Sequence, residues 1–143
     1  MDADRADELT AAWVDRHRPE DAPSPAAREG IRRLLEDRVP DPAAAAAIVD
    51  VEGRRQVAAL AGGALYLLWA VPGSSSVPEA ARCRRIPLER ASVELSERVE
   101  GAKAVRHWWF ELPDEPLVLR VHDARDGALA EALAAALGWP SLG

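Results

Sequence analysis

The sequence of 143 residues contains a single cysteine, Cys83, and no apolar run long enough to cross a bilayer. One cysteine excludes an internal disulfide and the zinc motifs that need several cysteines. A membrane-spanning helix needs about 20 apolar residues, so no such helix is predicted. The first residues are Met-Asp-Ala-Asp-Arg, which lack the basic and apolar regions of a signal peptide. We therefore expect a cytoplasmic protein in which Cys83 is a small packed side chain.

A surplus of positive charge is also missing. The chain holds 24 acidic and 18 basic side chains, which gives a net charge of −6. This imbalance lies entirely in residues 1–52, with 13 acidic and 7 basic side chains, whereas residues 53–143 hold 11 of each. Nucleic acids and anionic membranes are bound by dense basic surfaces. The charge pattern therefore argues against nucleic acid as a partner and against stable membrane association.

The sequence also lacks the short motifs that identify common enzymes. It has no glycine-rich phosphate loop, no nucleophile elbow, no histidine pair at helical metal spacing and no pair of cysteines. We therefore assign no catalytic residue, metal ligand or cofactor. Because 48% of the residues are apolar, the chain can bury a core of ordinary size for one domain.

Three helix starts are predicted in the first third of the chain. Residues Asp4–His17 show helical spacing of apolar side chains, with Asp4 as the cap. Ser24-Pro25 is typical of a second helix start. Asp41-Pro42 leads into Ala43–Ala47, which we predict to be a short helix that turns into a strand at Ile48–Val51, although the helix could also continue. The apolar stripes are too narrow to form a core alone, so residues 1–47 are predicted to dock on the body, residues 48–143, as one cooperative unit.

The body is predicted to be a series of antiparallel strands followed by a helix. Gly62-Gly63 is a two-residue hairpin signal, because glycine adopts positive φ without steric cost. The pattern predicts strands at Gln56–Ala61, Ala64–Val71, Arg82–Leu88 and Ala91–Arg98, a hairpin over residues 106–122, and a helix at Gly127–Leu137 that ends at Gly138.

The register of the last hairpin can be predicted from its turn. If Pro113–Pro116 forms a four-residue loop, Leu112 pairs with Leu117. His107 then lies opposite His122, Trp109 opposite Arg120, and Trp108 opposite Val121. This register places Trp108 in the core and stacks the Arg120 guanidinium on Trp109 at the surface.

The fold class is α+β. The expected architecture is one curved antiparallel sheet or partial barrel, closed by the C-terminal helix, with two or three N-terminal helices packed on it. Over about residues 50–139 the chain resembles the bacterial pleckstrin-homology-like (PH-like) superfamily and its GRAM-type relatives. The resemblance lies in Val57–Trp69, the Ile86–Val93 step, the Trp108–Val121 hairpin and the Gly127–Leu137 helix. It implies a scaffold for binding protein, peptide or a lipid headgroup.

The candidate partner-binding residues are Trp109, Arg120, His107, His122, Arg82 and Arg84. Tryptophan and arginine are enriched in binding hot spots. Headgroup-binding relatives carry basic residues around the first hairpin, and in this chain we place that turn at Gly62-Gly63, with only Arg54 and Arg55 upstream. We therefore expect a non-catalytic adaptor module for a protein or peptide of unknown identity. The alternative is a small-ligand sensor or small enzyme with a pocket in the sheet.

Overall fold

The computed structural model describes residues 1–143 except for residues 51, 78, 112–115 and 139–143. The described chain is α+β, as predicted, and all its strand pairs are antiparallel. Its helices are α1 (Ala3–Asp15), α2 (Pro25–Arg38) and α3 (Asp123–Ala136), with short 3₁₀ turns at Pro19–Asp21 and Leu88–Arg90. Its strands are β1 (Ala44–Val49), β2 (Arg55–Ala61), β3 (Ala64–Val71), β4 (Ala80–Pro87), β5 (Ser92–Glu100), β6 (Lys103–Glu111) and β7 (Pro116–His122).

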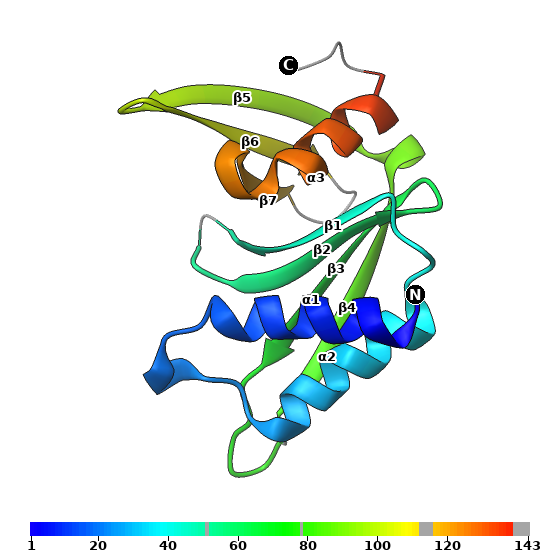
Figure 1. Cartoon of the computed structure of the whole chain (residues 1–143), viewed down its shortest axis with the longest axis vertical. Coiled ribbons are helices and arrows are strands. Elements are labelled where there is room, and N and C mark those ends of the chain that lie inside the picture. The colour runs from blue at the N-terminus through cyan, green and yellow to red at the C-terminus, as the bar shows by residue number, and fades with distance from the viewer. Residues whose placement is uncertain (51, 78, 112–115, 139–143) are drawn as a thin grey trace.

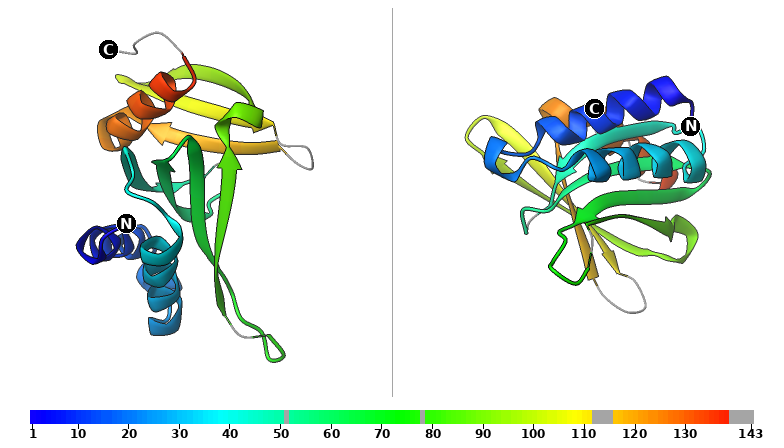
Figure 2. Two further views of the ribbon diagram at one scale, coloured as in Figure 1. Left: turned by 90° about the vertical axis from the view of Figure 1, so that its right-hand side faces the viewer. Right: turned by 90° about the horizontal axis from the view of Figure 1, so that it is seen from below.

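The strands form two separate sheets. Sheet A has the order β1-β2-β3-β4 and sheet B the order β5-β6-β7, and the described strands do not close into a barrel. The expectation of one continuous curved sheet is therefore wrong. The chain leaves sheet A after β4 through the 3₁₀ turn at Leu88–Arg90 and starts sheet B in a different direction (Figure 2).

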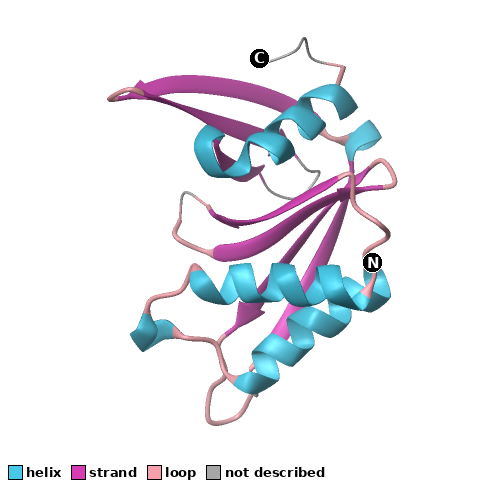
Figure 3. Cartoon of the chain, in the orientation of Figure 1, coloured by secondary structure: helices cyan, strands magenta, loops and turns pink. Residues whose placement is uncertain are grey.

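The elements are stacked in layers. Sheet B lies at one end of the molecule, α3 lies between the two sheets, and α1 and α2 cover the opposite face of sheet A (Figures 1 and 3). Sheet A therefore has a hydrophobic core on each face. The core toward α3 includes Trp108, Phe110 and Leu133, and the core toward the N-terminal helices includes Trp13, Ile31 and Leu35.

Each of the two N-terminal helices begins after a capping residue whose side chain accepts a hydrogen bond from a backbone N–H of the first turn. Ser24 caps α2 as predicted, because its Oγ accepts a hydrogen bond from the backbone N–H of Ala27 at 3.1 Å. The cap of α1 is Asp2 rather than the predicted Asp4: its Oδ1 accepts from the Arg5 N–H at 2.8 Å. Helix α2 approaches β4 closely at Gly30, where an added Cβ would lie 2.8 Å from the Cβ of Ala81. Glycine at this position lets the helix pack against the strand.

Strand β1 replaces the predicted third helix. Ala44–Val49 pairs with β2 over its whole length, so the boundary proposed at residue 47 falls inside the first strand. Alanine favours helices, but propensity is a weak preference that tertiary packing overrides. Ala47 faces α1, and Ala44 faces α3. The small side chains allow a helix to pack on each face of the strand.

The two-residue hairpin at Gly62-Gly63 is confirmed. Both glycines have positive φ, at 57° and 73°, which is the conformation that a tight hairpin of this kind requires. The turn joins β2 to β3 with Ala61 opposite Ala64. These strands form the centre of sheet A, and every residue of Gln56–Ala61 is buried.

The predicted register of the last hairpin is wrong: each residue of β6 faces a β7 residue two positions earlier in the sequence than predicted. Glu111 pairs with Pro116, so Trp108 lies opposite Leu119 instead of Val121, and Trp109 lies opposite Val118. The loop assumed at residues 113–116 includes positions outside the described residues. A shift of two keeps every side chain on its predicted face, which is why Trp108 is still fully buried while Trp109 is 40% exposed.

None of the described helices is long and apolar enough to span a membrane.

Candidate functional site

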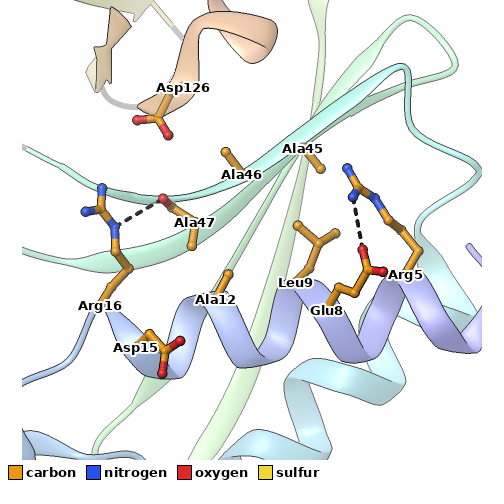
Figure 4. Close-up of a pocket in the computed structure, with 10 residues that line it drawn as sticks. All are labelled: Arg5, Glu8, Leu9, Ala12, Asp15, Arg16, Ala45, Ala46, Ala47 and Asp126. Atoms are coloured by element: carbon orange, nitrogen blue, oxygen red, sulfur yellow. Dashed lines mark hydrogen bonds and ion pairs between the residues drawn. The ribbon is translucent and has the colours of Figure 1, made fainter. Parts of the chain in front are cut away.

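A hollow runs along the edge of sheet A. It has a volume of about 680 Å³ and lies between α1, β1 and the start of α3 (Figure 4). Helix α1 lines it with Arg5, Glu8, Leu9, Ala12 and Asp15, the C-cap of α1 with Arg16, strand β1 with Ala45, Ala46 and Ala47, and α3 with Asp126. We call this hollow the edge groove.

The β1 residues that line the edge groove come from both faces of the sheet. Ala45 and Ala47 face the N-terminal helices, whereas Ala46 faces α3. Successive residues of a strand point to opposite faces, so one hollow can contact all three only at the edge of the strand. β1 is the terminal strand of sheet A, and its edge away from β2 therefore forms the floor of the groove.

The hydrogen bonds of the β1–β2 turn show which backbone groups face the groove. The Asp50 N–H donates to Arg54 O at 3.0 Å, in the register of the ladder. Bonded and non-bonded pairs alternate along an antiparallel ladder. The N–H and C=O groups of Ala45, Ala47 and Val49 therefore point away from β2, and those of Ala45 and Ala47 point toward the groove.

The end of α1 is attached to this edge. Arg16 Nε donates to the Ala47 carbonyl at 3.3 Å, which independently places that carbonyl on the groove side (Figure 4). Arg55 Nε donates in turn to the Arg16 carbonyl at 3.2 Å, and Trp13 Nε1 donates to the Arg55 carbonyl at 3.1 Å. These three bonds hold α1 at a fixed position beside β1 and so form a stable wall of the groove.

Charged side chains of both signs line the groove. Its lining includes the carboxylates of Glu8, Asp15 and Asp126 and the guanidinium groups of Arg5 and Arg16. Arg5 is paired with Glu8 at 3.3 Å, and Arg16 is bonded to the β1 carbonyl. Asp126 is 4% exposed, and its own backbone conformation is non-helical, at a kink within α3. Its carboxylate points toward β1 (Figure 4).

The structure separates the residues predicted to bind a partner. His107 and Trp109 lie on β6 of sheet B, while Arg82 and Arg84 lie on β4 of sheet A. The register places His107 opposite Arg120 and His122 opposite Val105, so the predicted histidine pair and the predicted Trp109–Arg120 pair are both wrong. Trp109 Nε1 instead donates to Ser96 Oγ at 3.4 Å. Arg82 and Arg84 therefore lie on a different sheet from the other four candidates.

Strand β1 also changes which turn is the first hairpin. That turn is the β1–β2 connection, where the Asp50 N–H donates to the Arg54 carbonyl, and not Gly62-Gly63. Arg54 and Arg55 therefore lie at the first hairpin. The Arg54 guanidinium lies over the Trp69 ring at 5.4 Å, and Arg55 is bonded to the end of α1. Both arginines thus have roles in packing sheet A and its helices.

The reactivity of Cys83 can be used to test how closely α2 packs on sheet A. Cys83 lies on β4, and burial raises the pKa of its thiol, an effect that the charge of Arg38 only partly opposes. Because the thiolate is the reactive form, iodoacetamide at pH 8 should alkylate Cys83 more slowly than it alkylates the thiol of glutathione. The pH at which the alkylation rate reaches half its maximum, the midpoint of the rate–pH profile, should be higher for Cys83 than for glutathione. In 6 M guanidinium chloride the two midpoints should coincide. A native midpoint equal to that of glutathione would show that burial does not act on this thiol.

Comparison with family models, with curated proteins and with solved structures gives no match to this chain. Within the described part of the chain, no group of three or more histidine, cysteine, aspartate or glutamate side chains is arranged to hold a metal ion.

Proposed function

We propose that this chain is a non-catalytic binding module that recognises a protein or peptide partner through the edge groove. The observation that carries the proposal is the outer edge of β1, which pairs with none of the described strands and forms the floor of a hollow between α1 and α3. Backbone N–H and C=O groups at a sheet edge are a template for another polypeptide. The side chains around them supply charge for selectivity.

We further propose that the body belongs to the PH-like class of binding scaffolds. Two observations support this relationship: the strands follow one another in two antiparallel sheets of four and three, and the last strand leads directly into α3, which packs between the sheets. Under this proposal, α1 and α2 are additions that cover one face of sheet A, and α1 forms one wall of the groove.

A photo-crosslinking experiment tests the binding function. Ala12 is exposed and lines the groove, so p-benzoylphenylalanine placed there should react with a partner seated on β1. The full chain carrying this residue is irradiated in an extract of the organism that encodes it. We expect discrete adducts with one or a few proteins, identified by mass spectrometry.

The matched control carries the same photoreactive residue at Asp37, which is exposed on α2 and lies outside the groove. Adducts from position 12 should be absent from position 37 and should disappear when an excess of the unlabelled chain is added. An identical set of adducts at both positions, or none at either, would contradict partner binding at the groove.

A further inference from the structure

We infer that the partner binds as an added strand: an extended, positively charged segment of another protein pairs with the open edge of β1 and extends sheet A to five strands. This inference rests on the proposed function and specifies how the partner binds. The outward groups of Ala45, Ala47 and Val49 span about 13 Å, at about 3.3 Å per residue, and so match a segment of about five residues.

The edge has the chemistry that strand addition needs. Residues 45, 47 and 49 present N–H and C=O groups at alternate positions, as an unpaired strand does. Only the Ala47 carbonyl has a described partner, the Arg16 Nε, and this bond of 3.3 Å is long and involves a flexible side chain. An incoming N–H can replace it.

The groove has room for such a strand because β1 is built from alanine. Ala45, Ala46 and Ala47 leave the space that larger side chains would fill, and α1 stays beside the edge because of the bonds of Trp13 and Arg16. Exposed long edges are usually protected by charges, proline or bulges. Among the described residues, the Arg16 side chain is the one group bonded to the outward side of this edge, and α1 and α3 flank it.

Charge selects among extended segments. Helix α1, which forms one wall of the groove, holds four acidic side chains and one basic one, and the first 52 residues hold the whole net charge of −6. Arg5 is paired with Glu8, and Arg16, once the incoming strand takes its place on the Ala47 carbonyl, can neutralise only one further carboxylate of this acidic helix. A segment rich in lysine or arginine is therefore attracted to the groove, and its affinity falls with salt.

The test begins with a library of random twelve-residue peptides displayed on phage and selected on the immobilised full chain. Enriched peptides are synthesised, and their dissociation constants are measured by fluorescence polarisation. We expect an excess of lysine and arginine. In the best peptide, N-methylation should weaken binding at least tenfold at alternate positions of the paired segment and less than twofold at the positions between them, because a strand bonds its neighbour with every second residue.

A substitution in the chain provides the complementary test. Ala45→Pro removes one outward N–H that does not bond to β2, so it should weaken peptide binding at least tenfold, whereas Ala45→Ser keeps the N–H and should change binding less than twofold. Circular dichroism establishes that each variant is folded. If Ala45→Pro does not fold, the methylation pattern of the peptide decides.

The outcomes separate this inference from the proposed function. If peptides bind but methylation shows no period of two, or a folded Ala45→Pro variant binds as the wild type does, strand addition is wrong and peptide recognition stands. If binding depends on Trp109 instead, the partner uses sheet B and the inference is overturned. If no peptide is enriched over an unrelated acidic protein, both proposals fail.

Discussion

Replacing Trp108 by alanine should lower the free energy of unfolding by about 3–5 kcal/mol, the usual cost of removing a large aromatic side chain from a packed core. Trp108 is fully buried and belongs to the core in which sheet B, α3 and sheet A meet. Urea denaturation followed by far-ultraviolet circular dichroism measures the loss, since this signal does not depend on tryptophan fluorescence.

Trp109→Ala is the matched control. The two tryptophans are neighbours on β6, but Trp109 is 40% exposed on the opposite face. Its removal should cost less than half as much as that of Trp108, because less apolar area returns to water and no closed cavity is left. Equal losses for the two variants would mean that the faces of sheet B are assigned wrongly.

Removing residues 1–40 should make the rest of the chain associate. This truncation keeps all of β1 but deletes both helices that cover one face of sheet A, where Val57, Tyr66 and Leu68 are buried. It also deletes Trp13, Ile31 and Leu35, whose burial contributes about 1.5–3 kcal/mol each. Together these contributions are comparable with a whole free energy of unfolding, about 5–15 kcal/mol.

Size-exclusion chromatography with light scattering measures the outcome of the truncation. We expect aggregates or oligomers and a strong increase in binding of a hydrophobic dye, because large exposed apolar patches promote association. A truncated chain that remains monomeric and unfolds at the same urea concentration as the full chain would show that the helices are an independent extension. It would also contradict the prediction that the chain is one cooperative unit.

Local chemistry predicted most elements correctly. Ser24-Pro25 begins a helix, Gly62-Gly63 forms the hairpin, and alternation along β6 separates the buried Trp108 from the exposed Trp109. The register of β6 with β7 was missed because the hydrophobic pattern has a period of two. It fixes which face each residue occupies, but it cannot distinguish registers that differ by two, and only the turn decides between them.

The edge groove could not be predicted from the sequence. Its floor is Ala44–Val49, where the alanines indicated a helix and only the β-branched Ile48 and Val49 suggested a strand. Helix propensity is local, whereas the strand owes its existence to β2 on one side and to helices packed on both faces. The wall residues Arg5, Asp15 and Arg16 carry no spacing that marks them as a site. They become one only when α1 lies beside the strand.

The small side chains of β1 set a limit on how related chains can vary. Enlarging Ala47 would displace α1, and enlarging Ala44 would displace α3, so neither position can gain volume without moving a layer of the molecule. Glycine, alanine and serine can replace one another there with little change in size. Chains that share this architecture should therefore be recognisable by a run of small residues ahead of the first hairpin, in a strand that methods based on β-propensity overlook.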